Sequence, residues 1–295
     1  MTTVKKPKYE QLDPISHILK RPDMYCGSVR LRAVDEYVSG DEFSISKQTI
    51  KASPAITRIF IEVLSNAIDN AERSAASTTP CTKIKVNIDK ATGETSVWND
   101  GMVVPIEIDE IQKCYNHTMI FGRLLTGSNY DDEEERMVAG RNGLGSKLCN
   151  VFSTQFTVEG VDTDVGKKLV QTWTNNMRDT TDPVVTTNKG VRGYTKITWT
   201  PDFARFGLKG YTKDIIRLYV RHVIDAAMIS KVKVEINDVP VPVNNLAKYS
   251  ALYDTPTDEK LLIKSGKCEV MLTPSSEFEA VSFVNGVCTK LGGPH

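Results

Sequence analysis

The chain has 295 residues, 40% hydrophobic and 25% charged, which is the composition of a globular protein with room for one large domain or two smaller ones. Its 37 basic residues balance its 37 acidic residues, so the net charge gives no reason to expect a nucleic-acid or membrane surface, and any polyanion contact must come from local patches. No apolar run reaches the roughly 18 residues of a bilayer span, and the basic N-terminus leads into no signal-peptide core.

Cysteines and histidines are scattered along the chain. The cysteines lie at positions 26, 81, 114, 149, 268 and 288, and the histidines at 17, 117, 222 and 295. Because neither set shows paired spacing, we expect no disulfide framework, zinc knuckle or histidine ligand pair. Reduced thiols fit an intracellular protein.

Two helices are predicted in the first quarter of the chain, over residues 11–20 and 54–73. In the second, Ser53 suits the N-cap and Pro54 the first position. Its apolar stripe comprises Ile56, Ile59, Phe60, Val63, Ala67 and Ala71. A separate polar stripe comprises Glu62, Asn66, Asp69 and Asn70. Such a polar face is typical of a half-exposed helix, and the alternative is a face that meets a ligand.

Two strands, at residues 83–89 and 95–98, are predicted to form a hairpin. It ends in Asn99-Asp100-Gly101, which is either a plain turn or a polar strand end that contacts a ligand. Residues 119–139 predict a short helix followed by a polar loop with an acidic run at 131–135. Such a run is usually a solvated tip, and the loop is long enough for a lid.

Residues 140–147 read Gly-Arg-Asn-Gly-Leu-Gly-Ser-Lys, followed by an apolar run. Three glycines before a helix predict a loop whose N–H groups, with the helix N-terminus, hold an anion such as phosphate. The spacing is neither that of a P-loop nor that of a dinucleotide fingerprint. A plain glycine turn therefore stays open on this motif alone.

The rest of the chain predicts a mixed α and β fold. Strands are expected at 155–159, 168–173, 194–199 and 231–237, with a helix over 214–228. Turn residues place a domain boundary near 245–250, and further strands are expected at 268–272 and 280–284. Because the sequence then stops on open strands, we expect an incomplete second domain.

Two of these segments resemble one known family. Residues 60–70 resemble the N-box of the GHKL ATPases, which include gyrase, the large heat-shock chaperone, histidine kinases and the mismatch-repair protein MutL. Residues 120–156 are similar to the ATPase region of eukaryotic-type type II DNA topoisomerases, including those of large DNA viruses. The similarity extends over nearly the whole chain.

The resemblance implies an α+β fold, the GHKL (Bergerat) α/β sandwich, in which helices cover one face of a mixed sheet and the nucleotide lies under a lid. It implies an ATP-binding domain with an N-terminal strap over residues 1–248 and a partial transducer domain over 249–295. ATP and Mg²⁺ are the implied cofactors. The implied partners are DNA and the DNA-cleavage region, through the complete enzyme, and a second copy on ATP binding; no membrane partner is expected. The implied location is the nucleus, or the host cell or virion of a virus.

The resemblance also assigns roles by position. Glu62 matches the general base and Asn66 the magnesium ligand, which suits a carboxylate that takes a proton and an amide oxygen that holds a hard cation. Asn70, Asn99 and Thr195 match nucleotide-pocket positions, the last two beside adenine. The remaining matches line the ribose and phosphates: Gly127, Ser128, Asn129, Gly140, Arg141, Asn142, Gly143, Leu144, Gly145, Ser146 and Lys147.

The chain departs from the family pattern at several points. Val103 replaces a glycine beside the adenine pocket, and Gly127 replaces a serine. Tyr25, by contrast, lies in a segment that resembles the family's N-terminal strap. The lysine-bearing Gln-x-Lys loop of the transducer is missing, so we expect ATP binding with slow hydrolysis. The alternatives are a nucleotide-dependent dimerisation module with little hydrolysis and another GHKL ATPase.

Overall fold

The computed structural model describes residues 11–124, 144–190, 192–253, 259–266, 268–284 and 286–289. Its helices are α1 (Pro14–Lys20), α2 (Pro54–Ser74), α3 (Asn116–Gly122), α4 (Gly145–Val151), α5 (Lys213–Ser230) and α6 (Leu246–Ser250). Its strands are β1 (Arg32–Ser39), β2 (Ile45–Ala52), β3 (Lys83–Ile88), β4 (Thr95–Asn99), β5 (Ser153–Asp162), β6 (Lys167–Thr174), β7 (Asp179–Thr180), β8 (Val184–Thr187), β9 (Tyr194–Pro201), β10 (Lys233–Ile236), β11 (Val239–Pro240), β12 (Leu261–Ser265), β13 (Cys268–Leu272), β14 (Phe283–Val284) and β15 (Val287–Cys288).

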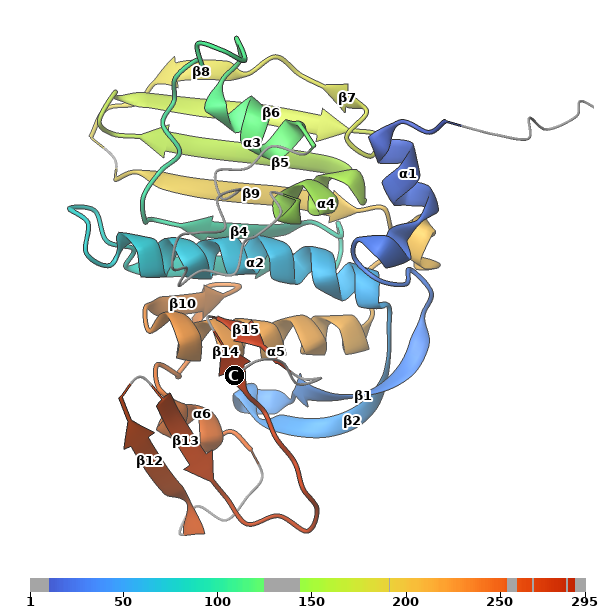
Figure 1. Ribbon diagram of the computed structural model, residues 1–295, viewed down its shortest axis with the longest axis vertical. Coiled ribbons are helices and arrows are strands. Elements are labelled where there is room, and N and C mark those ends of the chain that lie inside the picture. Colours follow the sequence, from blue (N-terminus) through green and yellow to red (C-terminus); the bar gives the residue numbers. More distant parts are fainter. Residues whose placement is uncertain are drawn as a thin grey trace, which may run out of the picture.

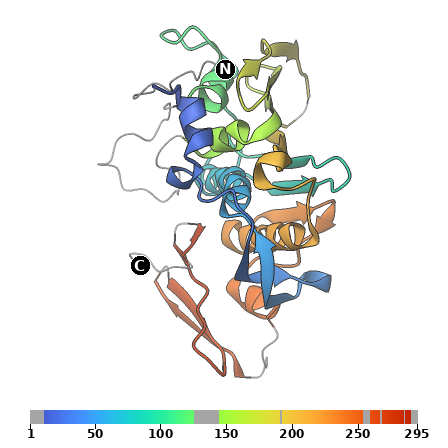
Figure 2. The same cartoon turned by 90° about the vertical axis from the view of Figure 1, so that its right-hand side faces the viewer.

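One large sheet forms the centre of the fold. In the described part of the chain its order is β11-β10-β3-β4-β9-β5-β6-β7, with β8 paired to β6. β10 runs parallel to β3 and the other pairs are antiparallel, so the sheet is mixed, as expected. Figure 1 shows α4 in front of β9 and α2 running along β4, and Figure 2 shows α2 end-on between α4 and α5. The α+β sandwich expected from the sequence is confirmed.

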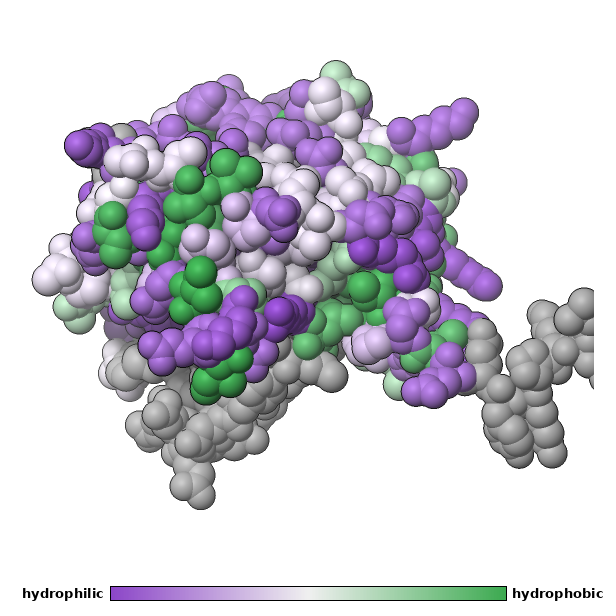
Figure 3. Space-filling model, turned by 90° about the horizontal axis from the view of Figure 1, so that it is seen from above, coloured by the Kyte–Doolittle hydropathy of each residue, from purple (hydrophilic) through white to green (hydrophobic). Residues whose placement is uncertain are grey.

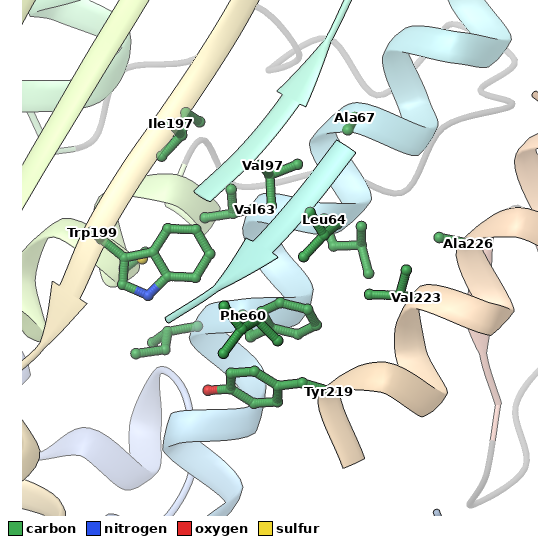
Figure 4. Close-up of a cluster of buried hydrophobic side chains, with 14 of the residues drawn as sticks. Phe60, Val63, Leu64, Ala67, Val97, Ile197, Trp199, Tyr219, Val223 and Ala226 are labelled. Atoms are coloured by element: carbon green, nitrogen blue, oxygen red, sulfur yellow. The ribbon is translucent and has the colours of Figure 1, made fainter. Parts of the chain in front are cut away.

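The apolar stripe of α2 joins the helices to the sheet. Ser53 caps the helix by accepting a hydrogen bond from the Ile56 N–H at 3.4 Å, and Pro54 follows it, as predicted. Phe60 stacks on Tyr219 of α5, with ring centroids 3.9 Å apart, and packs at 6.3 Å against Trp199 of β9 (Figure 4). All six predicted stripe residues are buried. This packing fixes the rotation of α2 and therefore the direction in which its polar stripe points.

The hairpin β1–β2 is an element that the sequence did not predict. Its strands pair over their whole length, and its apolar side packs on α5. That side contributes the buried Val38, Ile50 and Ala52 and the partly buried Val34, around Leu218 of the helix. The hairpin extends the fold beneath α5 (Figure 1).

The C-terminal segments are small and exposed. The predicted boundary at 245–250 falls on α6, strand 268–272 is confirmed as β13, and of 280–284 only Phe283–Val284 is a strand. Leu261, Leu272 and Phe278 are 57%, 52% and 96% exposed. Seen from above, the opposite end of the molecule instead carries hydrophobic side chains scattered among hydrophilic ones (Figure 3). No helix of the described residues is long and apolar enough to cross a membrane.

Candidate nucleotide site

The polar stripe of α2 lies at the edge of the core. Asp69 and Asn70 are buried, whereas Glu62 and Asn66 are half-buried. Because Asn66 follows Glu62 by one helical turn, the two side chains lie on the same side of α2. The polar stripe is therefore partly buried along its length. This burial fits both alternatives for α2, a half-exposed helix and a helix whose polar face meets a ligand.

Three residues predicted to line the pocket come together at the end of α2. The Asn70 Nδ2 donates to the Asn99 Oδ1 at 2.6 Å and to the Met102 carbonyl at 2.9 Å. Asn99 is the last residue of β4 and lies directly opposite Thr195 of β9. Since directly opposite residues of an antiparallel pair share a face, Asn99 and Thr195 both point toward α2. A Cβ at Gly101 would lie 3.0 Å from the Asn70 amide, so any other residue here would force that amide to move by a few tenths of an ångström.

Asp100, the middle residue of the strand-end motif, has a structural role. Its carboxylate accepts hydrogen bonds from the Thr82 N–H and hydroxyl and from the Lys83 N–H, and pairs with Arg192 at 3.1 Å. Burial alone would raise the pKa of Asp100, but these hydrogen bonds and the Arg192 charge outweigh it and hold that pKa below its ordinary value. Asp100 therefore fastens the end of β4 to β3 and holds Asn99 in place.

The glycine-rich segment reaches the described structure at its last four residues. Leu144 is the N-cap of α4, which begins at Gly145, as predicted. The N–H groups of a first helical turn have no acceptor within the helix, so they are available to an anion. A Cβ at Gly145 would overlap the Glu62 Oε2, which shows that the carboxylate lies against the first residue of α4. Two predicted site segments, 83 residues apart in sequence, are thus in contact.

Lys147 is the third residue of α4, in its first turn, and is 2% exposed. Burial lowers its pKa to about 8 because the charged ammonium loses water. Ser146 beside it is also buried. A bound anion would offset the cost of burying the Lys147 ammonium, which lies beside the first-turn N–H groups of α4.

His117 is a buried polar residue that the sequence did not single out. It lies on α3 with its ring over Gly160 of β5, where a Cβ would be 2.5 Å from the His117 Nε2. Neither ring nitrogen has a hydrogen-bond partner among the described residues. Burial lowers the pKa of His117 to about 4, against the opposing charge of Asp162. Gly160 pairs with Thr195, so the ring lies one strand beyond the predicted adenine position; no sequence signal marks it.

Two further predicted features can be located. Val103 packs against Gly193, where a Cβ would lie 3.0 Å from the Val103 Cγ1. Tyr25 lies in a turn and its hydroxyl is 2.8 Å from the His17 Nδ1. The other predicted positions lie outside the described residues: Gly127, Ser128, Asn129, Gly140, Arg141, Asn142 and Gly143, together with the lid-like loop.

A separate pocket of about 90 Å³ lies beside α2. Arg58, Ile61 and Ser65 line it from α2, and α5 and the β14–β15 segment close it. Among the described residues, none of those predicted to bind nucleotide lines this pocket, although Arg58 pairs with Glu62. Over the described residues, no group of three or more His, Cys, Asp or Glu side chains could hold a metal ion.

Comparisons with known proteins agree with this geometry. The family model for histidine kinase-, DNA gyrase B- and HSP90-like ATPases matches residues 52–204, about half of the chain. The chain is 40% identical over 311 residues to DNA topoisomerase 2 of Invertebrate iridescent virus 6, covering 100% of this chain and 27% of that protein. It is 38% identical over 301 residues to DNA topoisomerase 2 of Acanthamoeba polyphaga mimivirus, covering 98% and 23%. The crystal structure of the ATPase region of Saccharomyces cerevisiae topoisomerase II matches with a TM-score of 0.91 at 38% identity, over 96% of this chain and 75% of that one.

The fold, the site and the matched model define the class: the chain belongs to the histidine kinase-, DNA gyrase B- and HSP90-like ATPases, which bind ATP. Within that class it belongs with the ATPase regions of type II DNA topoisomerases. It spans 27% and 23% of the length of the two viral relatives. The family resemblance read from residues 60–70 and 120–156 is confirmed.

Proposed function

We propose that this chain binds Mg-ATP between α2 and the start of α4 and hydrolyses it with Glu62 as the general base. The observation that carries the proposal is the contact of the Glu62 carboxylate with Gly145, the first residue of α4. A γ-phosphate held by the N–H groups of that turn would lie within reach of a water molecule next to Glu62. As the oxygen of that water attacks the γ-phosphorus, the bond from the γ-phosphorus to the β–γ bridging oxygen would break and ADP would leave. The proton of the water would pass to the Glu62 carboxylate.

The other residues divide between the two ends of the nucleotide. Asn99 and Thr195 bind the adenine end, and Asn70 holds Asn99 through the 2.6 Å hydrogen bond. Leu144, Gly145 and Ser146 offer backbone N–H groups to the phosphates. The Lys147 ammonium neutralises charge that develops on the leaving phosphates. The positions at 127–129 and 140–143 complete this set in the proposal.

Among the residues proposed for this site, Asn66 would be the ligand of magnesium. A single amide oxygen, that of Asn66, suits a hard cation that takes its other ligands from water and phosphate oxygens. When bound, Mg²⁺ would supply positive charge to the triphosphate. Asn66, on the same face of α2 as Glu62, would hold it.

For the whole protein, we propose a type II DNA topoisomerase that dimerises on ATP binding and acts on DNA through its cleavage region. Its proposed location is the nucleus, or the host cell or virion of a virus. Residues 1–248 form its ATP-binding domain and 249–295 part of a transducer. The exposed apolar residues of β12 and β13 support that division, because such side chains normally pack against further structure.

Two substitutions test the proposal. Glu62→Ala is expected to keep affinity for a non-hydrolysable ATP analogue and to lower the single-turnover hydrolysis rate about 10²- to 10⁴-fold. Asn66→Ala is expected to lose the magnesium dependence of binding. Glu72→Ala, an exposed residue of the same helix, is the matched control and is expected to behave as wild type. Normal hydrolysis by Glu62→Ala, or no hydrolysis by the wild-type chain, contradicts the proposed reaction.

A further inference from the structure

The two carboxylate oxygens of Glu62 face different partners. Arg58 lies four residues before Glu62 on α2, and its Nη2 is 2.5 Å from the Glu62 Oε1. The other oxygen, Oε2, is the atom that a Cβ at Gly145 would overlap. One oxygen is therefore bound to a guanidinium, and the other is directed at the first turn of α4.

The Arg58–Glu62 pair is poorly placed to stabilise the helix. Arg58 lies in the second turn of α2, toward the positive end of the helix, so the helix dipole gives a cation there no support. A basic residue four positions before an acidic one is also the weaker order of such pairs. The Arg58 side chain is 51% exposed, so its charge is well screened. Helix stability does not account for an arginine here.

Orientation of the carboxylate does account for it. Over the part of the chain that the structure describes, Arg58 is the ion-pair partner of Glu62. No other hydrogen bond or ion pair within the described residues holds the carboxylate of this half-buried glutamate. The planar guanidinium presents fixed donors and stays protonated, so it holds a carboxylate without competing for its proton.

We infer that Arg58 is a positioning residue for Glu62: it binds Oε1 so that Oε2 faces the attacking water at the start of α4. The inference rests on the proposed role of Glu62 as general base. The proton taken from water then resides on Oε2, since Arg58 accepts none, and returns to solvent after the phosphate leaves. Arg58 touches neither nucleotide nor water in this arrangement, so it affects the rate and not the binding of ATP.

The test compares single-turnover hydrolysis and ATP-analogue affinity in four variants of the full chain. Arg58→Ala is expected to lower the hydrolysis rate about tenfold to hundredfold, the size of effect of a misplaced catalytic group, with analogue affinity within about twofold of wild type. Arg58→Lys is expected to recover part of the rate, because an ammonium can still reach Oε1. Adding Arg58→Ala to Glu62→Ala is expected to cause no further loss. Arg73→Ala, an exposed arginine of the same helix, is the matched control and is expected to match wild type.

The outcomes separate this inference from the proposed function. If Arg58→Ala keeps the wild-type rate or exceeds it while Glu62→Ala is inactive, the role of Arg58 is wrong and that of Glu62 stands. A loss confined to analogue affinity also overturns the inference, because it would make Arg58 a nucleotide ligand. Should Glu62→Ala hydrolyse ATP normally, the proposed function itself fails. Circular dichroism and thermal melting of each variant show whether a rate loss reflects unfolding.

Discussion

Replacing Lys147 by methionine separates what its buried charge costs the fold from what it contributes to nucleotide binding. The side chain is 2% exposed, and burial lowers its pKa from 10.5 to about 8. Methionine has a similar length and no charge, so it fills the same space without the desolvation cost. We expect Lys147→Met to be more stable than wild type without nucleotide and to bind ATP poorly.

The size of the stabilisation follows from the pKa shift. A drop from 10.5 to about 8 corresponds to about 3 kcal/mol at 1.36 kcal/mol per unit, as an upper limit. Lys147 also makes interactions in the fold that methionine would lose, so a net gain of about 1–3 kcal/mol is expected at pH 7.

The sign of the pH dependence is fixed by the same shift. Between pH 8 and 10.5 the unfolded chain binds more protons at this lysine than the folded chain, so the stability of the wild type rises with pH across that window. The cost of the charge is complete below pH 8, about 2 kcal/mol at pH 9, and nearly absent above pH 10.5. Urea unfolding of both proteins at pH 7, 9 and 10.5 should show their difference shrinking in this order. A variant that is less stable than wild type at pH 7 would refute the assigned cost.

The second readout is nucleotide binding. A saturating analogue at about 100 times its Kd stabilises a folded protein by about 2.7 kcal/mol, and removal of a charged phosphate contact weakens binding about tenfold to hundredfold. Thermal melting with and without Mg-nucleotide should therefore show a large shift in wild type and a small one in Lys147→Met. Equal shifts would show that Lys147 does not contact the phosphates.

Two further substitutions test contacts in the site. Gly145→Ala places a Cβ against the Glu62 carboxylate and should lower the hydrolysis rate about tenfold to hundredfold. The control Gly210→Ala, with nothing within 4 Å of its Cβ position, should keep the wild-type rate. Equal phosphate-release rates for the two variants would contradict this prediction. His117→Gln tests stability at acid pH. Because burial lowers the pKa of His117 from 6.5 to about 4, the free energy of unfolding of wild type should fall by about 2 kcal/mol more than that of the variant between pH 7 and 5. Equal losses of both proteins in urea unfolding would contradict this prediction.

The strongest sequence predictions were those with a complete local signal. Helix α2 carries a capping serine, a proline at its first position and an apolar stripe of helical period, and the structure begins it at Pro54 as predicted. The polar stripe was found by the same period. Its direction depends on how Phe60 packs against Tyr219, which no local pattern encodes.

The elements that escaped prediction lack such a signal. The hairpin β1–β2 buries three apolar side chains against α5 and fills its other positions with mixed residues, so neither strand shows a clean alternation. His117 has a sequence context like that of any polar helix residue, and only its position above Gly160 makes it unusual. Both depend on contacts between segments far apart in sequence.

The contact between Glu62 and Gly145 shows why the site could be predicted in pieces but not as a whole. The sequence marks a glycine at 145 and indicates a close approach, yet it does not say what approaches. The structure supplies a carboxylate there, and a backbone φ outside the left-handed region leaves close packing as the reason for glycine. Because residue 145 has no Cβ, the helix motif that holds Glu62 and the glycine-rich motif can come into contact. The methyl group added by Gly145→Ala should therefore lower ATP hydrolysis while leaving nucleotide binding largely unchanged.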